Sequence, residues 1–156
     1  CTSPQYATTF ATWVDWRDDN NGFRSMHRGD SGGHYPIVQD GTTELGVYSV
    51  ADGGWRPSGY SIAVTGWQLV ISIAQDTDCT ADGGGGGTTS HYIGTASSAP
   101  AYVGVSDRSP SSGSKTHYYG YPGQGPGKVA QNWVWRRALT SAEMFQIWSD
   151  TYDRYV

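Results

Sequence analysis

Aromatic residues beside glycine-rich turns are the side chains of this sequence best suited to binding chemistry. Trp55 and Arg56 follow a Gly-Gly pair, and Tyr119 and Tyr121 flank a glycine. Trp and Tyr rings stack on the apolar C–H faces of sugars, while nearby Arg, Asp, Asn and Gln side chains hydrogen-bond the hydroxyl groups. We therefore expect a carbohydrate-binding surface at the loop rim that includes Trp55, Arg56, Tyr119, Tyr121 and Asp30.

The motifs that would indicate an enzyme are incomplete. Residues 29–33 read GDSGG, the spacing of a serine-protease nucleophile loop, but the one histidine before Ser31 is His27, four positions away. A catalytic triad of that order needs a His and an Asp placed much earlier in the chain. Glycoside hydrolysis needs a pair of carboxyl groups, and the two Glu residues, Glu44 and Glu143, belong to a predicted turn and a predicted helix cap. We expect no catalytic activity.

Loops rich in carboxylates make calcium the one candidate cofactor. Asp76, Asp78 and Asp82 crowd one loop, and residues 18–21 (Asp-Asp-Asn-Asn) crowd another. Calcium accepts six to eight oxygen ligands in flexible geometry, but Ala81 stands where the EF-hand spacing needs glycine. Solvated turns are the competing interpretation, so the metal ligands stay unknown. The four histidines lack the close pairing of a zinc site and are expected to be ordinary strand or rim residues.

Two cysteines, Cys1 and Cys79, are predicted to form one disulfide. An even number of cysteines suits an oxidising compartment, so the expected location is secreted or on the cell surface. Two unrelated thiols, or a bond from Cys1 to another chain, remain alternatives. Because the chain begins with Cys and not Met, we expect it to be a processed product or a fragment.

The net charge and the lack of a long apolar run argue against two classes of partner, nucleic acids and the membrane interior. The formal net charge is −4, whereas proteins that neutralise nucleic-acid phosphates are normally basic. No run of apolar residues approaches the 18 or so that a membrane span requires. The tripeptide Arg28-Gly29-Asp30 has the pattern of an integrin-recognition sequence. The expected partner is therefore a glycan or an extracellular protein, without nucleic acid or a membrane span.

The elements that must position these residues are predicted to be short strands. Runs rich in aromatic and β-branched residues alternate with clusters of Gly, Asn, Asp, Pro and Ser, which is typical of an all-β sandwich. We expect two antiparallel sheets within one domain, residues 1–156. The predicted strands lie near residues 8–17, 22–28, 35–39, 45–50, 59–63, 67–75, 91–95, 102–106, 117–121 and 128–137.

One short helix is predicted near the C-terminus, and one strand is predicted to be central. Thr140 and Glu143 have the spacing of a capping box, in which each side chain satisfies a backbone donor at the helix start. Residues 67–75 are apolar on both faces, which is typical of a central strand. Most of the seven tryptophans are expected to fill the core, and that expectation is strongest for Trp13, Trp16, Trp67 and Trp133.

The sequence resembles laminin-G-like domains in four segments that follow in the expected order. Residues 127–144 (ending in Ala-Leu-Thr-Ser-Ala-Glu-Met) resemble the closing strand and helix of that group, and residues 10–14 its first core strand. Residues 67–71 resemble the central strand that begins with Trp, and residues 91–94 the strand after it. A loop of five glycines, residues 83–87, replaces the Asp-Gly that usually precedes that last strand.

The resemblance implies a concanavalin A-like jelly-roll sandwich in a secreted or surface protein that binds glycans or other proteins. It assigns no metal site, because the calcium-binding Asp of the family has no single counterpart in this chain. The expected function is a non-catalytic extracellular recognition module that binds carbohydrate. The alternative is a structural subunit of a surface filament, sheath or matrix that self-assembles through its strands or Cys1.

Overall fold

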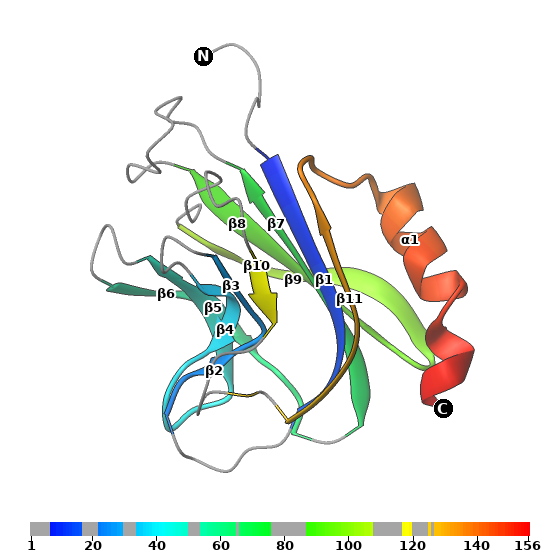
Figure 1. The fold of residues 1–156 in the computed structure, drawn as a ribbon, viewed down its shortest axis with the longest axis horizontal. Coiled ribbons are helices and arrows are strands. Elements are labelled where there is room, and N and C mark those ends of the chain that lie inside the picture. The colour runs from blue at the N-terminus through cyan, green and yellow to red at the C-terminus, as the bar shows by residue number, and fades with distance from the viewer. Residues whose placement is uncertain are drawn as a thin grey trace.

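Two antiparallel sheets pack face to face (Figure 1). The computed structural model describes residues 7–16, 22–29, 34–49, 54–64, 66–75, 87–107, 117–119, 125 and 127–156. The first sheet has the order β11-β1-β7-β8-β9 and the second has the order β10-β3-β4-β5-β6, with β2 also paired to β4. The all-β sandwich predicted from the strand spacing is confirmed.

The bounds of most strands lie within three residues of the predicted segments, but β6 begins five residues and β9 four residues earlier than predicted. The strands are β1 (Ala7–Trp16), β2 (Arg24–Ser25), β3 (His27–Gly29), β4 (His34–Val38), β5 (Glu44–Ser49), β6 (Gly54–Ser61), β7 (Trp67–Gln75), β8 (Thr88–Thr95), β9 (Ser98–Ser106), β10 (His117–Tyr119) and β11 (Gly127–Trp135). The segment predicted as one strand over residues 22–28 is divided into β2 and β3 at Met26. Met26 N–H donates to the carbonyl of Pro36, and Pro36 has no N–H to return, so the ladder is interrupted there.

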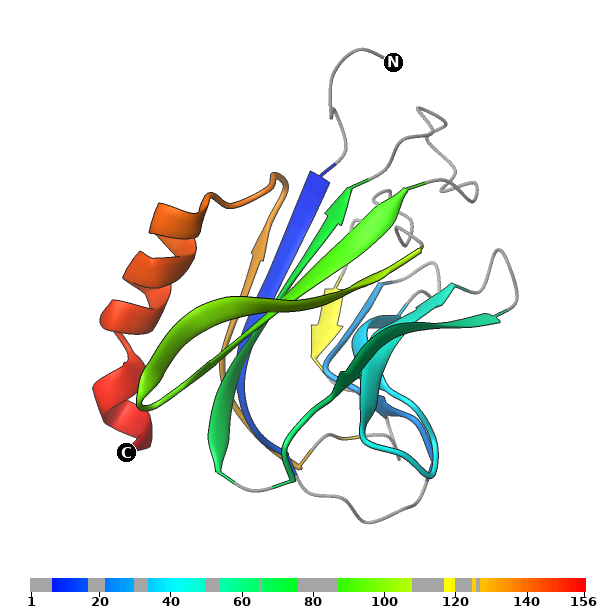
Figure 2. The ribbon, with the colours of Figure 1, turned by 180° about the vertical axis from the view of Figure 1, so that it is seen from behind.

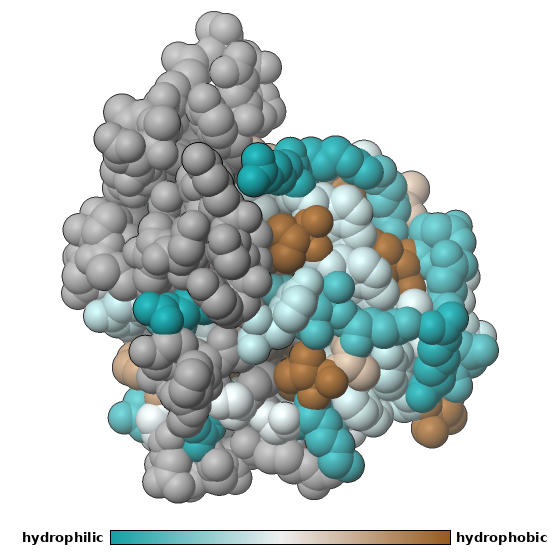
Figure 3. Space-filling model, in the orientation of Figure 1, coloured by the Kyte–Doolittle hydropathy of each residue, from teal (hydrophilic) through white to brown (hydrophobic). Residues whose placement is uncertain are grey.

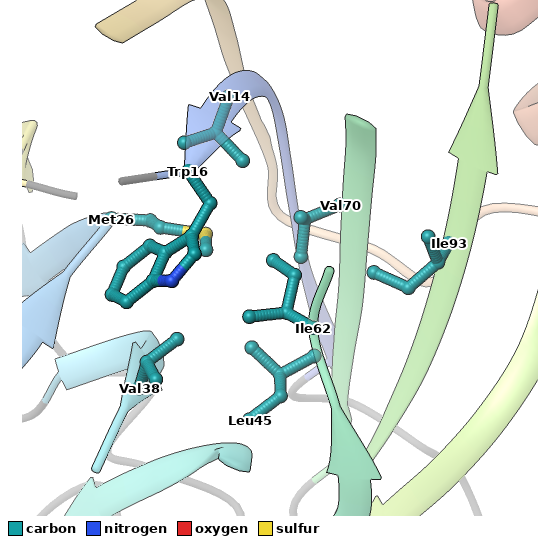
Figure 4. Close-up of a cluster of buried hydrophobic side chains, with 8 residues drawn as sticks. All are labelled: Val14, Trp16, Met26, Val38, Leu45, Ile62, Val70 and Ile93. Carbon is teal, nitrogen blue, oxygen red and sulfur yellow. The ribbon is translucent and has the colours of Figure 1, made fainter. Parts of the chain in front are cut away.

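The centre of the first sheet is buried on both faces, as predicted. β7 is the middle strand, and all ten residues of its neighbour β1 are buried. Between the sheets lies a core of Val14, Trp16, Met26, Val38, Leu45, Ile62, Val70 and Ile93 (Figure 4). Successive residues of a strand point to opposite faces, so the other residues of β1 and β7 form the opposite, outer face of this sheet.

A short helix, α1 (Ser141–Ser149), covers the outer face of the first sheet (Figures 1 and 2). The predicted capping box is present: Glu143 N–H donates to Thr140 Oγ1 at 3.3 Å, and Thr140 N–H donates to Glu143 Oε2 at 2.8 Å. A single 3₁₀ turn, η1 (Tyr152–Tyr155), follows the helix. No helix in the described part of the chain is both long and apolar enough to cross a membrane.

The cluster beneath α1 is centred on a tryptophan. Trp13 is fully buried, stacks on Tyr155 with ring centroids 4.4 Å apart, and donates its indole N–H to Thr151 Oγ1 at 2.8 Å. Trp16 is buried between the sheets, so the predicted core positions of both residues are confirmed. Trp67 and Trp133 are half-buried at the margin of the cluster under the helix.

One face of the described surface carries its hydrophobic residues in small groups (Figure 3). In Figure 3, brown patches are separated by polar or near-neutral residues on the face shown. The large hydrophobic residues that are most exposed include Tyr102, Tyr119 and Phe145, which lie on β9, β10 and α1.

Candidate functional site

Aromatic side chains line up on the outer face of the second sheet. His34, Tyr48 and Trp55 are cross-strand neighbours on β4, β5 and β6. In β5, Leu45 and Val47 are fully buried, so the alternation of a strand directs Tyr48 to the opposite face. Phe23 lies 5.9 Å from both Tyr48 and Trp55, measured between ring centroids. We call these four half-buried residues the outer-face aromatic row.

Two hollows adjoin this row. The first, of about 210 Å³, is lined by Phe23, His34, Ile37 and Tyr48, and we call it the outer-face cavity. The second, of about 550 Å³, lies where β6 meets β9 and is lined by Trp55, Arg56, Pro57, Val105 and Asp107. We call it the β6–β9 cleft. Trp55 belongs to the wall of the cleft and also contacts Phe23 of the outer-face cavity.

A bulge in β6 brings this strand against β9. Leu45 pairs with Tyr60 and Gly46 pairs with Pro57, which leaves two extra residues, Ser58 and Gly59, on β6. Gly59 has a φ of +77°, a conformation that glycine adopts at little cost. Bulges bend a strand and re-aim its side chains, and here the carbonyl of Ser58 approaches Gly104 of β9 so closely that a Cβ would overlap it.

A second close approach, between Gly46 of β5 and the ring of Trp55, determines where the Trp55 indole lies. A Cβ on Gly46 would overlap the carbonyl of Arg56 and would come within 2.6 Å of the Trp55 ring. Glycine at position 46 therefore lets the six-membered part of the indole lie directly over the backbone of β5. The ring is thus held against the sheet, and Trp55 stays half-buried.

A buried chain of hydrogen bonds joins the two sheets directly behind the cleft. Ser72 Oγ lies 2.8 Å from His91 Nδ1, His91 Nε2 lies 3.1 Å from Ser106 Oγ, and Ser106 Oγ donates to the carbonyl of Arg56 at 2.9 Å. Because the single hydroxyl proton of Ser106 goes to Arg56, His91 Nε2 must donate to Ser106 and Nδ1 must accept from Ser72. We call this chain the His91 relay.

Burial keeps the relay neutral. His91 is fully buried, and desolvation lowers the pKa of its imidazole from 6.5 to about 3. A neutral ring has one donor and one acceptor, which matches the two serine partners. The relay therefore fixes the backbone of Arg56 without placing a charge in the core.

The polar groups of the cleft come from one ion pair at its rim. Arg56 Nε lies 3.5 Å from Asp107 Oδ1, and Arg56 Nη1 donates to the carbonyl of Trp55 at 3.1 Å. The Arg56 side chain is 29% exposed and that of Asp107 is 82% exposed. Guanidinium carries five N–H donors, so these two contacts within the described part of the chain leave donors for a ligand beside a carboxylate acceptor.

The structure places the predicted site residues in different regions. Trp55 and Arg56 lie together in the β6–β9 cleft, on a strand that begins earlier than predicted. Tyr119 lies on β10 at the opposite edge of the same sheet, where its ring packs 5.1 Å from His27. Four strand spacings of about 4.8 Å put β10 roughly 19 Å from β6. Tyr119 is therefore not brought together with Trp55 and Arg56.

The remaining predictions fall outside the described residues. These are Asp30 and Tyr121 of the ligand surface, the Cys1–Cys79 disulfide, and the candidate calcium ligands Asp76, Asp78, Asp82 and residues 18–21. Within the described ranges, no group of three or more His, Cys, Asp and Glu side chains could hold a metal ion.

Several residues of the site were not predicted from the sequence. His34 and Tyr48 join Trp55 through the register of β4, β5 and β6. Phe23 reaches Trp55 from the segment before β2, and Asp107 reaches Arg56 from the other sheet. The alternation in β5 was the one available signal, because it places Tyr48 opposite Leu45 and Val47. The residues opposite Tyr48 could not be inferred, because the β6 bulge and the irregularity between His34 and Ile37 in the β4–β5 pair both shift the register.

Comparison with known proteins shows the fold alone. No family model and no curated protein matches the chain. The chain is similar to a sialidase from Trypanosoma rangeli, solved in complex with 2,3-difluorosialic acid as a covalent intermediate, with a TM-score of 0.52, 14% identity, and coverage of 95% of this chain and 24% of the sialidase. It is also similar to the native heptameric SAP-like pentraxin from Limulus polyphemus, with a TM-score of 0.46, 14% identity, and coverage of 92% and 69%. The chain spans about a quarter of the length of the sialidase.

Proposed function

We propose that this domain binds carbohydrate without transforming it, and that the β6–β9 cleft is the binding site. The observation that carries the proposal is the presence of Trp55 and the Arg56–Asp107 ion pair in one cavity of about 550 Å³. Small-molecule sites of this size combine apolar walls with a few convergent polar groups. An aromatic face with an adjacent donor and acceptor suits a sugar, which has an apolar C–H face and polar hydroxyls.

The surroundings of the cleft support recognition by a pre-formed surface. Pro57 and Val105 supply further apolar wall, and Val105 is 43% exposed. Gly46 holds the Trp55 indole against β5, and the His91 relay fixes the backbone of Arg56. Groups that are already ordered before binding lose less conformational entropy when the ligand arrives.

Binding without hydrolysis is supported by the carboxylates of the cleft. Most glycosidases place two carboxyl groups about 5–9.5 Å apart around the scissile bond. Among the described lining residues, Asp107 is the one carboxylate, and it is paired with Arg56. The resemblance to laminin-G-like domains supports an extracellular glycan as the partner and a secreted or cell-surface location.

The test is a glycan array followed by isothermal titration calorimetry with the strongest hit. Trp55→Ala should lower the affinity about tenfold, because one stacking contact is worth roughly 1–2 kcal/mol. Asp107→Asn should also weaken binding, and because Asp107 is 82% exposed its fold should be intact. Tyr102→Ala, which removes a 57% exposed ring on β9 outside the cleft lining, is the matched control and should bind like the wild type.

Two results would contradict the proposal. One is the absence of any bound glycan at millimolar concentration. The other is equal affinity of the wild type, Trp55→Ala and Asp107→Asn for a glycan that does bind. Tyr119→Ala compares the two edges of the second sheet. If the site is the cleft at β6, this variant should bind glycan like the wild type, whereas a site at β10 would make it lose glycan affinity.

A further inference from the structure

The outer-face aromatic row continues the proposed site beyond the β6–β9 cleft. Trp55 lines the cleft, and its ring lies 5.9 Å from Phe23, which lines the outer-face cavity. Tyr48 lies next to Trp55 across the strand pair, and His34 lies next to Tyr48. The two hollows are therefore connected by a surface of rings, with Trp55 between them.

The dimensions of this surface exceed those of one sugar ring. His34, Tyr48 and Trp55 occupy three adjacent strands, and two strand spacings of about 4.8 Å span roughly 10 Å. The cleft extends the surface further, toward Val105 on β9 and toward Asp107, the residue that follows this strand. A single pyranose in the cleft would leave Tyr48 and Phe23 without a ligand contact.

The row also carries little charge where a ligand would lie on it. Burial and the charge of Arg28 lower the pKa of His34 to about 4, so the imidazole is neutral at neutral pH. Ser25 donates to the carbonyl of His27, so His34 must donate from Nδ1 to Ser25 Oγ. Uncharged rings of this kind suit the apolar C–H faces of sugar units.

No helix in the described part of the chain packs on the outer face of the second sheet. α1 packs on the first sheet, whereas the second sheet contacts strands of the first sheet through the core that they share and where β6 meets β9. Phe23, His34, Tyr48 and Trp55 remain half-buried and not fully buried. Their rings meet at inclined angles of 55–84°, so they present both faces and edges to a ligand.

We propose that the preferred ligand is an oligosaccharide of at least two sugar units, bound across Trp55 with one unit in the β6–β9 cleft and another on Tyr48 and Phe23. This inference rests on the proposed carbohydrate-binding function and specifies its ligand class. It assigns the outer-face cavity as a second subsite and Trp55 as the contact shared by both subsites.

The experiment compares ligand length in wild type and variants by isothermal titration calorimetry. The probes are the one-, two- and four-unit fragments of the strongest hit of the glycan array. Wild-type affinity should rise at least about tenfold from one to four units, the effect of one further stacked ring. Tyr48→Ala should remove most of that rise while leaving affinity for the single unit unchanged, whereas Trp55→Ala should weaken binding of every fragment.

Phe23→Ala and Phe145→Ala complete the design. Phe23→Ala must show the same dependence on ligand length as Tyr48→Ala, and it provides the test if Tyr48→Ala does not fold. Phe145→Ala removes a 52% exposed ring from α1 and should bind all fragments like the wild type. Equal wild-type affinity for one and four units, or a length dependence that survives in Tyr48→Ala and Phe23→Ala, would overturn the second subsite and leave the proposed function standing. Failure of every fragment to bind would overturn both.

Discussion

The outer faces of the two sheets differ in what covers them. On the first sheet, Ala11, Trp13, Leu69 and Ile71 lie under α1 and are fully buried. On the second sheet, Tyr48 and its neighbours in the outer-face aromatic row are half-buried, and no described helix packs on them. Both faces arise from the same alternation of side chains along a strand. Aromatic residues are thus packed under a helix on the first sheet and stay half-buried on the second, where we propose that the ligand binds.

The largest expected difference is between two tryptophans, one from each face. Trp13→Ala removes a buried ring, its stacking on Tyr155 and its hydrogen bond to Thr151. The free energy of unfolding should fall by about 3–5 kcal/mol. Trp55→Ala should cost only about 1 kcal/mol because its ring is half-buried. Urea denaturation of both variants measures the contrast, and equal losses would mean that the second sheet is not an open face.

The pH dependence of stability tests the relay that joins the two sheets. The folded pKa of His91, about 3, lies below the unfolded value of 6.5, so the unfolded chain takes up the proton first as the pH falls. The free energy of unfolding should decrease from about pH 6.5 toward pH 3, by about 1.4 kcal/mol for each pH unit in the middle of that interval. Denaturation midpoints at successive pH values provide the measurement.

His91→Gln isolates this contribution. The amide can still hydrogen-bond to Ser72 and Ser106 but does not titrate, so the slope should become shallower. A remaining slope of the same sign is expected from His34, whose pKa is also lowered, to about 4. An unchanged slope in His91→Gln would show that His91 is not neutral and buried in the folded protein.

The order and type of the elements could be predicted from the sequence because they depend on local patterns. The capping box at Thr140 needs only its two residues, and β7 is apolar on both faces whatever its partners are. The division at Met26 depends on Pro36 of another strand, and that interaction is not local. The β6 bulge likewise depends on β9, since Ser58 approaches Gly104 across the sandwich.

The candidate site was predictable only in part for the same reason. Trp55 and Arg56 adjoin one another in the chain and share the cleft, whereas Asp107 comes from the opposite sheet. Tyr119 follows the same chemical logic as Trp55 but lies at the other edge of the second sheet. Residue type identified suitable side chains, and only the order of the strands decides which of them share a surface.

The close approach of β6 to β9 should depend on the absence of a side chain at Gly104. Gly104→Ala would place a Cβ against the carbonyl of Ser58, so β6 and β9 must separate. We expect a loss of about 1–3 kcal/mol in the free energy of unfolding, as for overpacked sites, together with weaker glycan binding in the cleft. Gly125→Ala has no atom within 4 Å of the added Cβ and should change neither. Equal behaviour of the two variants would argue against the close contact of β6 and β9.

The smallest effect should arise at the helix that covers the first sheet. Thr140→Ala removes the N-cap side chain of α1, which should cost about 1 kcal/mol. Glycan affinity should be unaffected, since α1 covers the outer face of the first sheet and none of its residues lines the proposed site. Thermal unfolding and calorimetry on the same sample check both parts, and a variant that binds less tightly would link the helix to the site.

The central claim is that ligands bind on the open face of the second sheet, and the seven indole N–H groups of the protein report on it directly. A ¹H–¹⁵N correlation spectrum recorded during titration with the four-unit fragment of the strongest array hit distinguishes them once each is assigned by mutation. We expect the indole signal of Trp55 to shift to saturation while those of Trp13 and Trp16, buried in the two cores, stay in place. A shift confined to Trp133 or Trp135, beside α1 on the first sheet, with Trp55 unmoved, would contradict the account.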